Sequence, residues 1–503
     1  MMNNAFTLLS AVYRDPNAIA IIDGQKIINY NNLLKISSIV GSNLFSHGLH
    51  EGSHLVTLLQ NNWQATIIYW ACQLYGIIIV PLNWRTTSKE LDYYLKDSEA
   101  KIVIFQDISS DAVSSSINSQ GILKISLKKS VDSTFIFENL LNENSKNIDY
   151  IKDNNLTSIM LYTSGTTGIG KGVPRSHFAE RSAAIAHIAQ NHYVYKENTL
   201  GVMPLYHTMG VRLLLSMCIL NGCFICQSKF SSDQALQLIY KEKITSLYLV
   251  PTLYHDLISN KTFSTSLIKT VEKIGFAGAS MNQDLLEKLD YYFKPKVFIN
   301  HYGSTEIYTF TYSENAQKKP GSAGKAGINQ IIKVIDIDSV SSLDVVESFI
   351  EGKIIASMKS SEAFKSYWNN PKANKNSIID GWYITGDIGF IDDEGDLFIT
   401  GRVDDMIISG GENILPIEIE NVLSSYNDID EVVVCGLPHE RLGEIVTAFI
   451  KSDKQIELRL LDEYFLKSEI AKFKRPRKYI FVDEIPKSPV GKVLRRKLKK
   501  IFS

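Results

Sequence analysis

The chain has few cysteines and no pattern that would link them. Its five cysteines are too scattered among 503 residues to form a disulfide framework: Cys72, Cys218, Cys223, Cys226 and Cys435. Cys223 and Cys226 form a C-x-x-C pair, but the pair lies in an apolar, strand-like run without a second pair or a histidine at ligand spacing. We therefore expect both to be small core residues and not metal ligands.

The sequence also lacks a strong net charge, a signal peptide and a long unbroken apolar run. Its formal net charge is −1, so no global signal indicates binding to nucleic acid or to an anionic membrane. The N-terminus has no basic region, and its apolar stretch soon meets Arg14-Asp15-Pro16. Residues 65–82 are strongly apolar, but Gln73, Gly76 and Pro81 favour a helix followed by a buried strand over a membrane span. We expect a cytoplasmic protein.

Helical and strand patterns alternate along most of the chain, which predicts an α/β fold with a mostly parallel sheet covered by helices. Around residue 404 the character changes to a small α+β unit, with a helix from Ile417 and strands at 431–436 and 446–451. The 503 residues are sufficient for one large domain and one small one.

Small or polar residues follow several predicted strands. They are His207 after a strand from Leu200, Gly278–Ser280 after 274–276, and Asn300–Glu306 after 297–299. Open α/β sheets bind ligands at the carboxyl ends of their strands. These segments are therefore predicted to form the walls of one crevice.

A stretch rich in hydroxyl groups and glycine follows the apolar residues 159–161. It runs from Thr163 to Gly168, and Lys171 comes shortly after it. Glycine lets backbone N–H groups approach a ligand closely, and hydroxyls and a lysine add donors, which suits a polyphosphate. Its spacing partly fits a nucleotide-binding P-loop, but Gly172 stands where that motif needs serine or threonine, and Pro174 opposes the helix that should follow.

Further segments offer the other groups that a nucleotide site needs. Residues 300–306 supply an aromatic ring, a glycine, a hydroxyl and a carboxylate, which together could stack a purine, reach a phosphate and hold Mg²⁺. Asp387 could accept the ribose hydroxyls, and Arg402 could reach ribose or phosphate. Lys492 follows a glycine in a predicted loop, so its ammonium can project into a cleft.

Residues 163–172 resemble the T-S-G-T-T-G-x-P-K-G signature of the adenylate-forming superfamily, with Gly170 where the family usually has proline. This superfamily contains acyl-CoA synthetases, peptide-synthetase adenylation domains and luciferases. The other motifs match in order and spacing over nearly the entire chain. Residues 204–207, 401–413 and 473–476 look most like bacterial aryl-CoA ligases of the 4-chlorobenzoate:CoA ligase type, followed by medium-chain fatty acyl-CoA ligases.

The resemblance implies the domain organisation and the reaction. A large N-terminal domain (1–403) of stacked, helix-covered sheets with a small β-region would bind ATP and the acid. A small mobile α+β domain (404–503) would carry the catalytic lysine, with its hinge at Asp404. The implied reaction is AMP-forming acid:CoA ligation, in which the acid first becomes acyl-AMP and then a CoA thioester. ATP, Mg²⁺ and coenzyme A are the implied cofactors.

The resemblance also implies which residues contact these cofactors. Those expected to hold the β- and γ-phosphates are Thr163, Ser164, Gly165, Thr166, Thr167, Gly168 and Lys171. Those expected at adenine, the α-phosphate and ribose are Gly278, Ala279, Ser280, Tyr302, Thr305, Asp387 and Arg402. Thr163 and Glu306 would bind Mg²⁺. Those expected to face coenzyme A are Arg85, Gly411, Asn413, Phe473, Arg475 and Arg477.

The residues predicted to act in catalysis are Lys492, Thr305, Glu306 and His207. Lys492 would bridge the acid carboxylate and the α-phosphate. His207 would contribute the one polar group of an apolar, aromatic-rich acid pocket, and its walls are predicted to be Met209, Tyr248, Val250, Ile307, Tyr308 and Phe310. A flat aromatic acid would stack on such walls.

Several alternatives stay open at this stage. A medium- or long-chain fatty acid would fit if the pocket is open at its far end. A stand-alone adenylation enzyme could load a carrier protein, although amino-acid pockets of that kind use an aspartate where residues 205–209 have none. A luciferase-like oxygenase and a nucleotide-binding regulator without catalysis are further alternatives, and the Lys492 loop argues against the regulator. The expected partners are a small carboxylic acid and coenzyme A, with no nucleic acid and no stable membrane insertion, in a monomer or homodimer.

Overall fold

The computed structural model describes residues 3–130, 133–142, 149–163, 170–339, 341, 344–409, 412–468, 470–487 and 493–502, with Asp404 and Asn413 described by their main chain alone. The chain divides into two compact units. Unit 1 comprises residues 1–320, 326–331 and 357–376, and unit 2 comprises residues 321–325, 332–356 and 377–503. The domain boundary predicted between residues 403 and 404 falls within unit 2 and stays a prediction.

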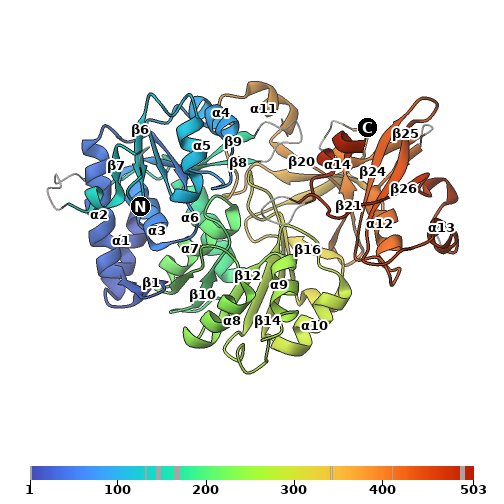
Figure 1. Cartoon of the computed structure of the whole chain (residues 1–503), viewed down its shortest axis with the longest axis horizontal. Helices are drawn as coiled ribbons and strands as arrows, with labels where there is room; N and C mark the ends of the chain where they lie inside the picture. The colour runs from blue at the N-terminus through green and yellow to red at the C-terminus, as the bar shows by residue number, and fades with distance from the viewer. Residues whose placement is uncertain are drawn as a thin grey trace. The chain divides into compact units, whose positions relative to one another are not determined.

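The first sheet of unit 1 has the strand order β7-β6-β5-β3-β4-β8-β9. Figure 1 labels its strands β6, β7, β8 and β9. Its strands are β3 (His54–Leu58), β4 (Ile78–Pro81), β5 (Ile102–Phe105), β6 (Leu123–Ser126), β7 (Phe135–Ile136), β8 (Thr157–Thr163) and β9 (Lys171–Ser176). The pairs from β7 to β8 are parallel, whereas β8 and β9 are antiparallel. In sequence, the predicted phosphate loop therefore lies between the two strands of an antiparallel pair at one edge of this sheet.

The second sheet of unit 1 has the order β15-β14-β13-β12-β10-β11-β1-β2. Its strands are β1 (Ile19–Asp23), β2 (Lys26–Asn29), β10 (Asn198–Gly201), β11 (Cys223–Cys226), β12 (Ser246–Leu249), β13 (Lys273–Ala277), β14 (Val297–Tyr302) and β15 (Thr311–Glu314). Strands β10 to β14 pair in parallel, so their carboxyl ends lie along one edge. That edge carries the segments predicted to form the crevice walls.

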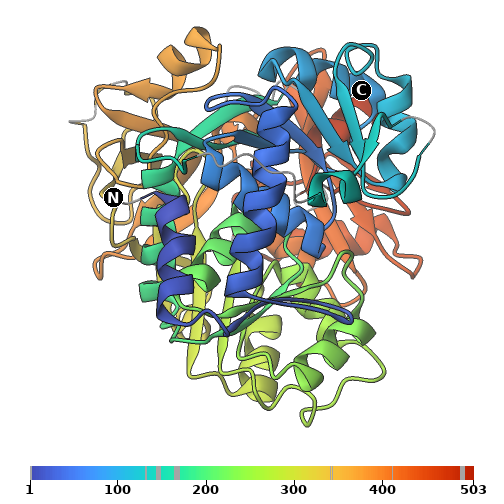
Figure 2. The same cartoon turned by 90° about the vertical axis from the view of Figure 1, so that its left-hand side faces the viewer.

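Helices cover both sheets of unit 1. They are α1 (Asn4–Arg14), α2 (Tyr30–Ser46), α3 (Trp63–Tyr75), α4 (Ser88–Ser98), α5 (Ser110–Ser115), α6 (His177–Gln190), α7 (Thr208–Ile219), α8 (Ser232–Lys241), α9 (Pro251–Ile258), α10 (Gln283–Phe293) and α11 (Pro371–Ser377). Asparagine side chains cap four of their N-termini by accepting a bond from a main-chain N–H: Asn3, Asn29, Asn62 and Asn282. Figure 2 shows α1 and α2 side by side. Short 3₁₀ turns occupy Asp107–Ser109, Phe137–Leu141 and Ala316–Lys318.

Unit 2 contains two groups of strands. One has the order β17-β18-β20-β21-β16, formed by β16 (Ser322–Ala326), β17 (Ile332–Ile335), β18 (Gly352–Ser357), β20 (Trp382–Ile391) and β21 (Leu397–Arg402), with β19 (Ile378–Ile379) on β20. The other has the order β23-β22-β25-β24, formed by β22 (Ile407–Ser409), β23 (Glu412–Ile414), β24 (Glu431–His439) and β25 (Gly443–Lys451), with β26 (Lys478–Phe481) on β25. Helices α12 (Pro416–Ser424), α13 (Leu458–Leu466) and α14 (Arg495–Phe502) and the 3₁₀ turns Val403–Asp405 and Lys472–Lys474 complete the unit.

The predicted α/β class is confirmed. In unit 2, residues 392–396 connect the antiparallel strands β20 and β21. The apolar residues 65–82 form most of α3 followed by β4, as predicted. Among the described residues, no helix combines the length and the hydropathy that crossing a bilayer requires. All five cysteines are buried and unpaired, and Cys223 and Cys226 lie in the core strand β11. The prediction that they are core residues is therefore confirmed.

Candidate active site

The β8–β9 hairpin presents two of the predicted phosphate and metal residues. Thr163 ends β8 and lies directly opposite Lys171, which begins β9. The Thr163 hydroxyl oxygen is buried and finds no hydrogen-bond partner among the residues that the structure describes. Residues Ser164, Gly165, Thr166, Thr167 and Gly168, which connect the two strands, lie outside the described residues. A buried hydroxyl without a partner is costly unless a ligand or water satisfies it, and the contact of Thr163 with a ligand stays a prediction.

Gly170 departs from the proline usual in the family, and its surroundings give a physical reason for a glycine. A Cβ atom at this position would lie 2.9 Å from the Thr163 carbonyl oxygen and 3.2 Å from the Tyr94 hydroxyl. The Tyr93 hydroxyl donates a hydrogen bond to the Gly170 carbonyl oxygen over 2.9 Å. The main chain at Gly170 is therefore packed closely, at a point where a side chain would clash.

The loop between β14 and β15 begins just after Tyr302, the last residue of β14, and carries Thr305 and Glu306. Its sharp return depends on Gly303, because a Cβ atom there would lie 2.1 Å from the Tyr308 carbonyl oxygen. The main-chain N–H of Ser304 donates to the Ile307 carbonyl over 2.9 Å. The Glu306 side chain is buried, with 4% of the residue exposed. The loop thus holds a carboxylate inside the protein at the carboxyl end of β14.

Tyr367 joins Lys171 to Glu306. Its hydroxyl donates to Glu306 Oε1 over 2.7 Å, and the Lys171 ammonium lies 4.2 Å from the centre of its ring. Main-chain hydrogen bonds also hold the chain around Tyr367. Phe364 N–H donates to the Glu306 carbonyl, and Trp368 N–H donates to the carbonyl of Gly172, the residue after Lys171, each over 2.9 Å. Sequence reasoning missed Tyr367, although the aromatic pair 367–368 before Asn-Asn-Pro was a visible signal.

The predicted adenine residues lie at the neighbouring strand end. Strand β13 ends at Ala277, which pairs with His301 of β14, so Gly278–Ser280 follow at the same edge as Tyr302. Gly278 has φ of +86°, a left-handed conformation that favours glycine, and residues 278–280 are exposed. Tyr302 packs edge-on against Phe310, with 5.0 Å between ring centres. The structure thus brings these residues to one edge, and their contact with adenine stays a prediction.

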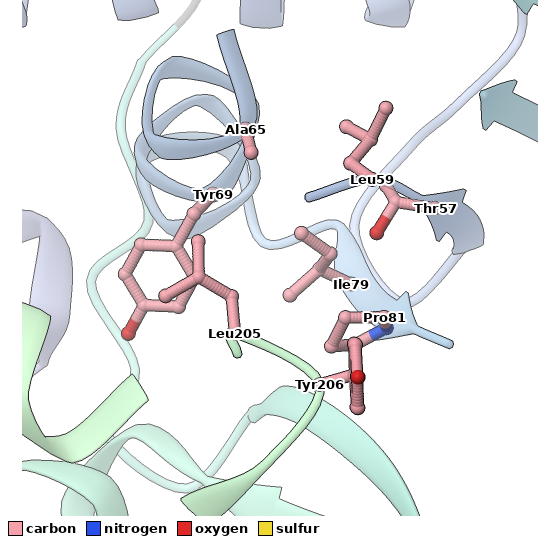
Figure 3. A pocket seen from close by; sticks show the side chains of 8 residues that line it. All are labelled: Thr57, Leu59, Ala65, Tyr69, Ile79, Pro81, Leu205 and Tyr206. Carbon is pink, nitrogen blue, oxygen red and sulfur yellow. The ribbon is translucent and has the colours of Figure 1, made fainter. Parts of the chain in front are cut away.

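The strand predicted to end at His207 is wrong in length. Strand β10 already stops at Gly201, and Pro204, which has no N–H, could not continue the ladder beyond it. Residues 204–207 turn, with His207 N–H donating to the Pro204 carbonyl. His207 instead caps α7, where its Nδ1 accepts a bond from Met209 N–H over 3.3 Å. Beside this turn, residues Leu205 and Tyr206 contribute to a small, largely apolar pocket (Figure 3). Its other lining residues are Thr57, Leu59, Ala65, Tyr69, Ile79 and Pro81.

The residues predicted to line the acid pocket are buried. They are Met209, Tyr248, Val250, Ile307, Tyr308 and Phe310. Tyr248 accepts a hydrogen bond from the buried guanidinium of Arg212, and Arg212 also donates to Thr309 Oγ1 over 2.7 Å. Sequence reasoning missed this arginine inside the apolar cluster. Contact of these residues with the acid, and the catalytic role of His207, stay predictions.

Unit 2 carries the predicted ribose residues as a pair. Asp387 of β20 lies opposite Arg402 of β21, and the two side chains form an ion pair of 3.3 Å. Both are partly accessible, with 13% of the Asp387 side chain and 30% of the Arg402 side chain exposed. A carboxylate held beside a guanidinium on adjacent strands is a suitable acceptor for ribose hydroxyls.

The residues predicted to face coenzyme A are spread over both units. In unit 1, the exposed Arg85 lies with its guanidinium carbon 3.6 Å from the centre of the Trp84 ring. In unit 2, Phe473 and Arg477 are exposed, and Arg475 forms an ion pair of 3.0 Å with Asp462. Lys492 and Gly411 lie outside the described residues. The main chain of Asn413 pairs with Ile408 in the β22–β23 hairpin.

Comparison with known proteins now identifies the family. A family model described as AMP-binding enzyme matches residues 8–368. The chain belongs to this family. A second model, described as the C-terminal domain of AMP-binding enzymes, matches residues 418–492. The predicted superfamily is therefore confirmed, and the Lys171, Glu306 and Tyr367 cluster of this AMP-binding enzyme lies within the first matched segment.

Individual relatives span nearly the whole chain. It is 30% identical to a 4-chlorobenzoate–CoA ligase of an Arthrobacter species, over 99% of this chain and 95% of that protein. It is also 30% identical to a long-chain-fatty-acid–CoA ligase of Mycobacterium tuberculosis, over 91% of this chain and 89% of that protein. The o-succinylbenzoate CoA synthetase of Bacillus subtilis, solved with its acyl-adenylate intermediate, has a TM-score of 0.87 at 26% identity, covering 99% of this chain and 98% of that one. The predicted enzyme class, an AMP-forming acid–thiol ligase, is confirmed by these matches.

Proposed function

We propose that this AMP-binding enzyme joins a benzoate-type carboxylic acid to coenzyme A, with ATP as the activating substrate and AMP and pyrophosphate as products. The observation that carries the proposal is the cluster at the β8–β9 hairpin. There the Lys171 ammonium and the buried Glu306 carboxylate both contact Tyr367. The buried Thr163 hydroxyl belongs to the residue opposite Lys171 in the β8–β9 ladder. That combination suits a polyphosphate and its counter-ion.

The chemistry proceeds in two displacements. An oxygen of the acid carboxylate bonds to the α-phosphorus of ATP, and the bond from that phosphorus to the β-phosphate oxygen breaks, releasing pyrophosphate. The sulfur of coenzyme A then bonds to the acyl carbon, the bond from that carbon to AMP breaks, and the thiol proton passes to solvent. The protein's contribution is to hold two anions together and to neutralise their charge. Lys171 and the proposed Lys492 supply positive charge, and Thr305 supplies a hydroxyl donor for the α-phosphate.

The residues present fit a magnesium ion. Mg²⁺ prefers oxygen ligands and is usually bound by one or two protein groups together with phosphate oxygens. Thr163 Oγ1 is a buried oxygen without a partner among the described residues, and Glu306 supplies a buried carboxylate. When bound there, the ion would neutralise charge on the phosphates of ATP. Tyr367 holds one carboxylate oxygen of Glu306, so the orientation of this ligand is set before ATP arrives.

The choice of acid rests on the relatives and on the aromatic residues of unit 1. The Arthrobacter and Bacillus relatives carry the names of benzoate-type acids. Tyr248, Tyr308 and Phe310, which are predicted to line the acid pocket, are buried. A fatty acid is the second candidate, because the Mycobacterium relative, at the same 30% identity, is named for a long-chain substrate.

A panel of acids tests the function. We expect CoA-thioester formation with benzoate and a halobenzoate, at higher kcat/KM than with hexanoate or octanoate, because flat rings stack on aromatic walls. Pyrophosphate release and thioester product are measured for each acid, with amino acids included. A steady rise of kcat/KM with aliphatic chain length and no turnover of aryl acids would favour the fatty acid. Release only with amino acids would indicate a carrier-loading enzyme, and no release with any acid would indicate a regulator.

Tyr367→Phe is expected to slow acyl-AMP formation by about 10- to 100-fold, the usual cost of losing a group that orients a metal ligand. The substitution removes only the hydroxyl that donates to Glu306 Oε1 and keeps the ring beside Lys171. The rate of pyrophosphate release at fixed Mg²⁺ measures the effect. Tyr30→Phe is the matched control, because the Tyr30 hydroxyl is equally buried but donates to the Met217 and Gly222 carbonyls. Equal rates for the two variants would contradict the role of Tyr367.

A further inference from the structure

A buried arginine lies beneath the loop that carries Thr305 and Glu306. Arg175, the fifth residue of β9, is completely buried and forms an ion pair with Glu180 of α6, whose side chain is also fully buried. A buried charge is expensive unless it is paired and hydrogen-bonded. A buried arginine at this strand position therefore indicates contacts that an apolar side chain could not make.

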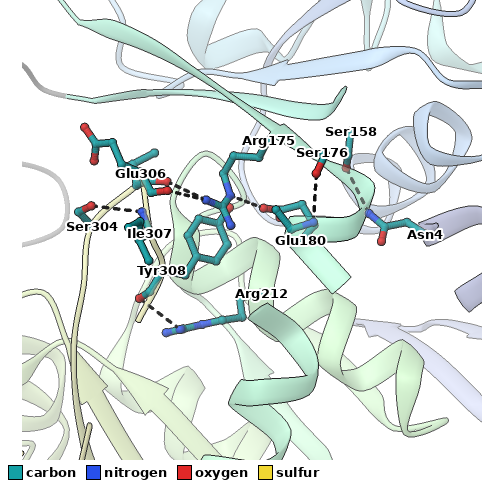
Figure 4. A network of polar contacts seen from close by, with 12 residues as sticks. Asn4, Ser158, Arg175, Ser176, Glu180, Arg212, Ser304, Glu306, Ile307 and Tyr308 are labelled. Carbon is teal, nitrogen blue, oxygen red and sulfur yellow. Dashed lines mark hydrogen bonds and ion pairs between the residues drawn. The ribbon is translucent and has the colours of Figure 1, made fainter. Parts of the chain in front are cut away.

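The remaining contacts of Arg175 are with the loop that carries Thr305 and Glu306. One terminal nitrogen, Nη1, donates to the Glu306 carbonyl oxygen over 3.0 Å and to the Thr305 carbonyl oxygen over 3.3 Å (Figure 4). Its guanidinium carbon lies 3.6 Å from the centre of the Tyr308 ring. The same side chain thus contacts the loop at three residues within four positions, two through the main chain and one through a ring face.

A second buried arginine holds the far side of this loop. Arg212 of α7 donates to the Tyr308 carbonyl over 3.4 Å and to Thr309 Oγ1 over 2.7 Å. Figure 4 shows Tyr308 between the two guanidinium groups, while the Glu306 carboxylate points away from Arg175. The main chain of the loop is therefore fixed by buried arginines. The side chain of Glu306 points to the opposite side, where the Tyr367 hydroxyl donates a hydrogen bond to it.

The strand geometry connects Arg175 to Lys171. Side chains at alternate positions of a strand share a face, so Lys171, Val173 and Arg175 lie on the same face of β9. At one end of this face Lys171 contacts Tyr367, and at the other Arg175 contacts the loop. One strand therefore sets the positions of the ammonium proposed for phosphate and of the carboxylate proposed for Mg²⁺.

We propose that Arg175 is a positioning residue for adenylation: it fixes the main chain at Thr305 and Glu306 so that these side chains meet MgATP in a set geometry. The inference rests on the proposed function and extends it to a residue that touches neither substrate nor metal. Loss of Arg175 should therefore weaken the binding of MgATP and slow acyl-AMP formation, beyond any loss of stability.

The experiment compares Arg175→Met and Arg175→Lys with Lys273→Met. Lys273 also belongs to a buried ion pair, with Glu197 at 2.7 Å, but it begins β13, at the end of the strand away from Gly278. For each variant we would measure the thermal midpoint, the Kd of MgATP by calorimetry, the Mg²⁺ concentration for half-maximal pyrophosphate release, and the rate of acyl-AMP formation.

We expect both methionine variants to unfold at lower temperature, because each leaves a buried carboxylate without its partner. Only Arg175→Met should also raise the Kd of MgATP and the half-saturating Mg²⁺, by about 10- to 100-fold, as for loss of a group that orients a metal ligand. Arg175→Lys keeps the charge beside Glu180 and loses the planar fork, so it should fold and show a smaller change in the same two quantities.

The inference would be overturned if Arg175→Lys bound MgATP and formed acyl-AMP as the unaltered enzyme does, while Arg175→Met either did the same or failed to fold. The same kinetic loss in Lys273→Met would also overturn it. These results differ from failure of the proposed function, in which the unaltered enzyme forms no acyl-AMP from any acid of the panel; that outcome would overturn both.

Discussion

Lys492→Ala is expected to slow acyl-AMP formation by about a hundred- to a thousandfold, a loss of ~2.7–4 kcal/mol of transition-state stabilisation. The resemblance to adenylate-forming enzymes assigns this lysine to the charge that develops at the α-phosphate, and residues 418–492 match the family's C-terminal domain. A point charge placed where negative charge grows contributes more in the transition state than in the ground state. The KM for ATP should therefore change less than kcat. Pyrophosphate release in a single turnover measures the effect.

Two comparisons make this prediction specific. Thioester formation from supplied acyl-AMP should stay largely intact in Lys492→Ala, because the bond between the acid and the α-phosphorus has already formed. Lys487→Ala is the matched control: Lys487 lies on the same segment, but it forms an ion pair of 2.7 Å with Glu431. Equal damage to both half-reactions, or an equal effect of the control, would show that Lys492 serves another purpose.

Glu306→Gln is expected to slow adenylation by more than about a hundredfold, above the range for a residue that only orients a metal ligand. The amide keeps the shape of the side chain and still accepts the Tyr367 hydrogen bond, but it removes the negative charge that Mg²⁺ requires. The predicted signature is a raised Mg²⁺ requirement, measured as the half-saturating concentration for pyrophosphate release.

Glu314→Gln provides the control for this variant. Glu314 ends β15 of the same hairpin, and its side chain is 51% exposed beside His192. Removing its charge tests whether the general electrostatics of the hairpin explain the effect. A Glu306→Gln enzyme with the unaltered Mg²⁺ requirement would place the metal on other residues, with Thr163 Oγ1 the next group to test.

Much of the fold follows from local patterns. Alternating apolar runs and helix signals predicted the α/β class and the helix and strand within residues 65–82. The failure at residues 200–207 has a local cause too: the apolar run continues past Gly201, the last residue of β10. Periodicity detects hydrophobicity, but it does not show where the last ladder hydrogen bond forms.

Sequence alone determined the family and the chemical groups of this enzyme, because motifs such as 163–171, 300–306 and 387 place particular donors and charges on strand-end loops. Only the tertiary structure decided which groups meet. Tyr367 reaches Glu306 across 61 positions, and Arg175 reaches it across 131. The sequence around such an arginine or tyrosine does not show which groups it contacts, since its partners are set by how sheets and loops pack and by the need to pair each buried charge.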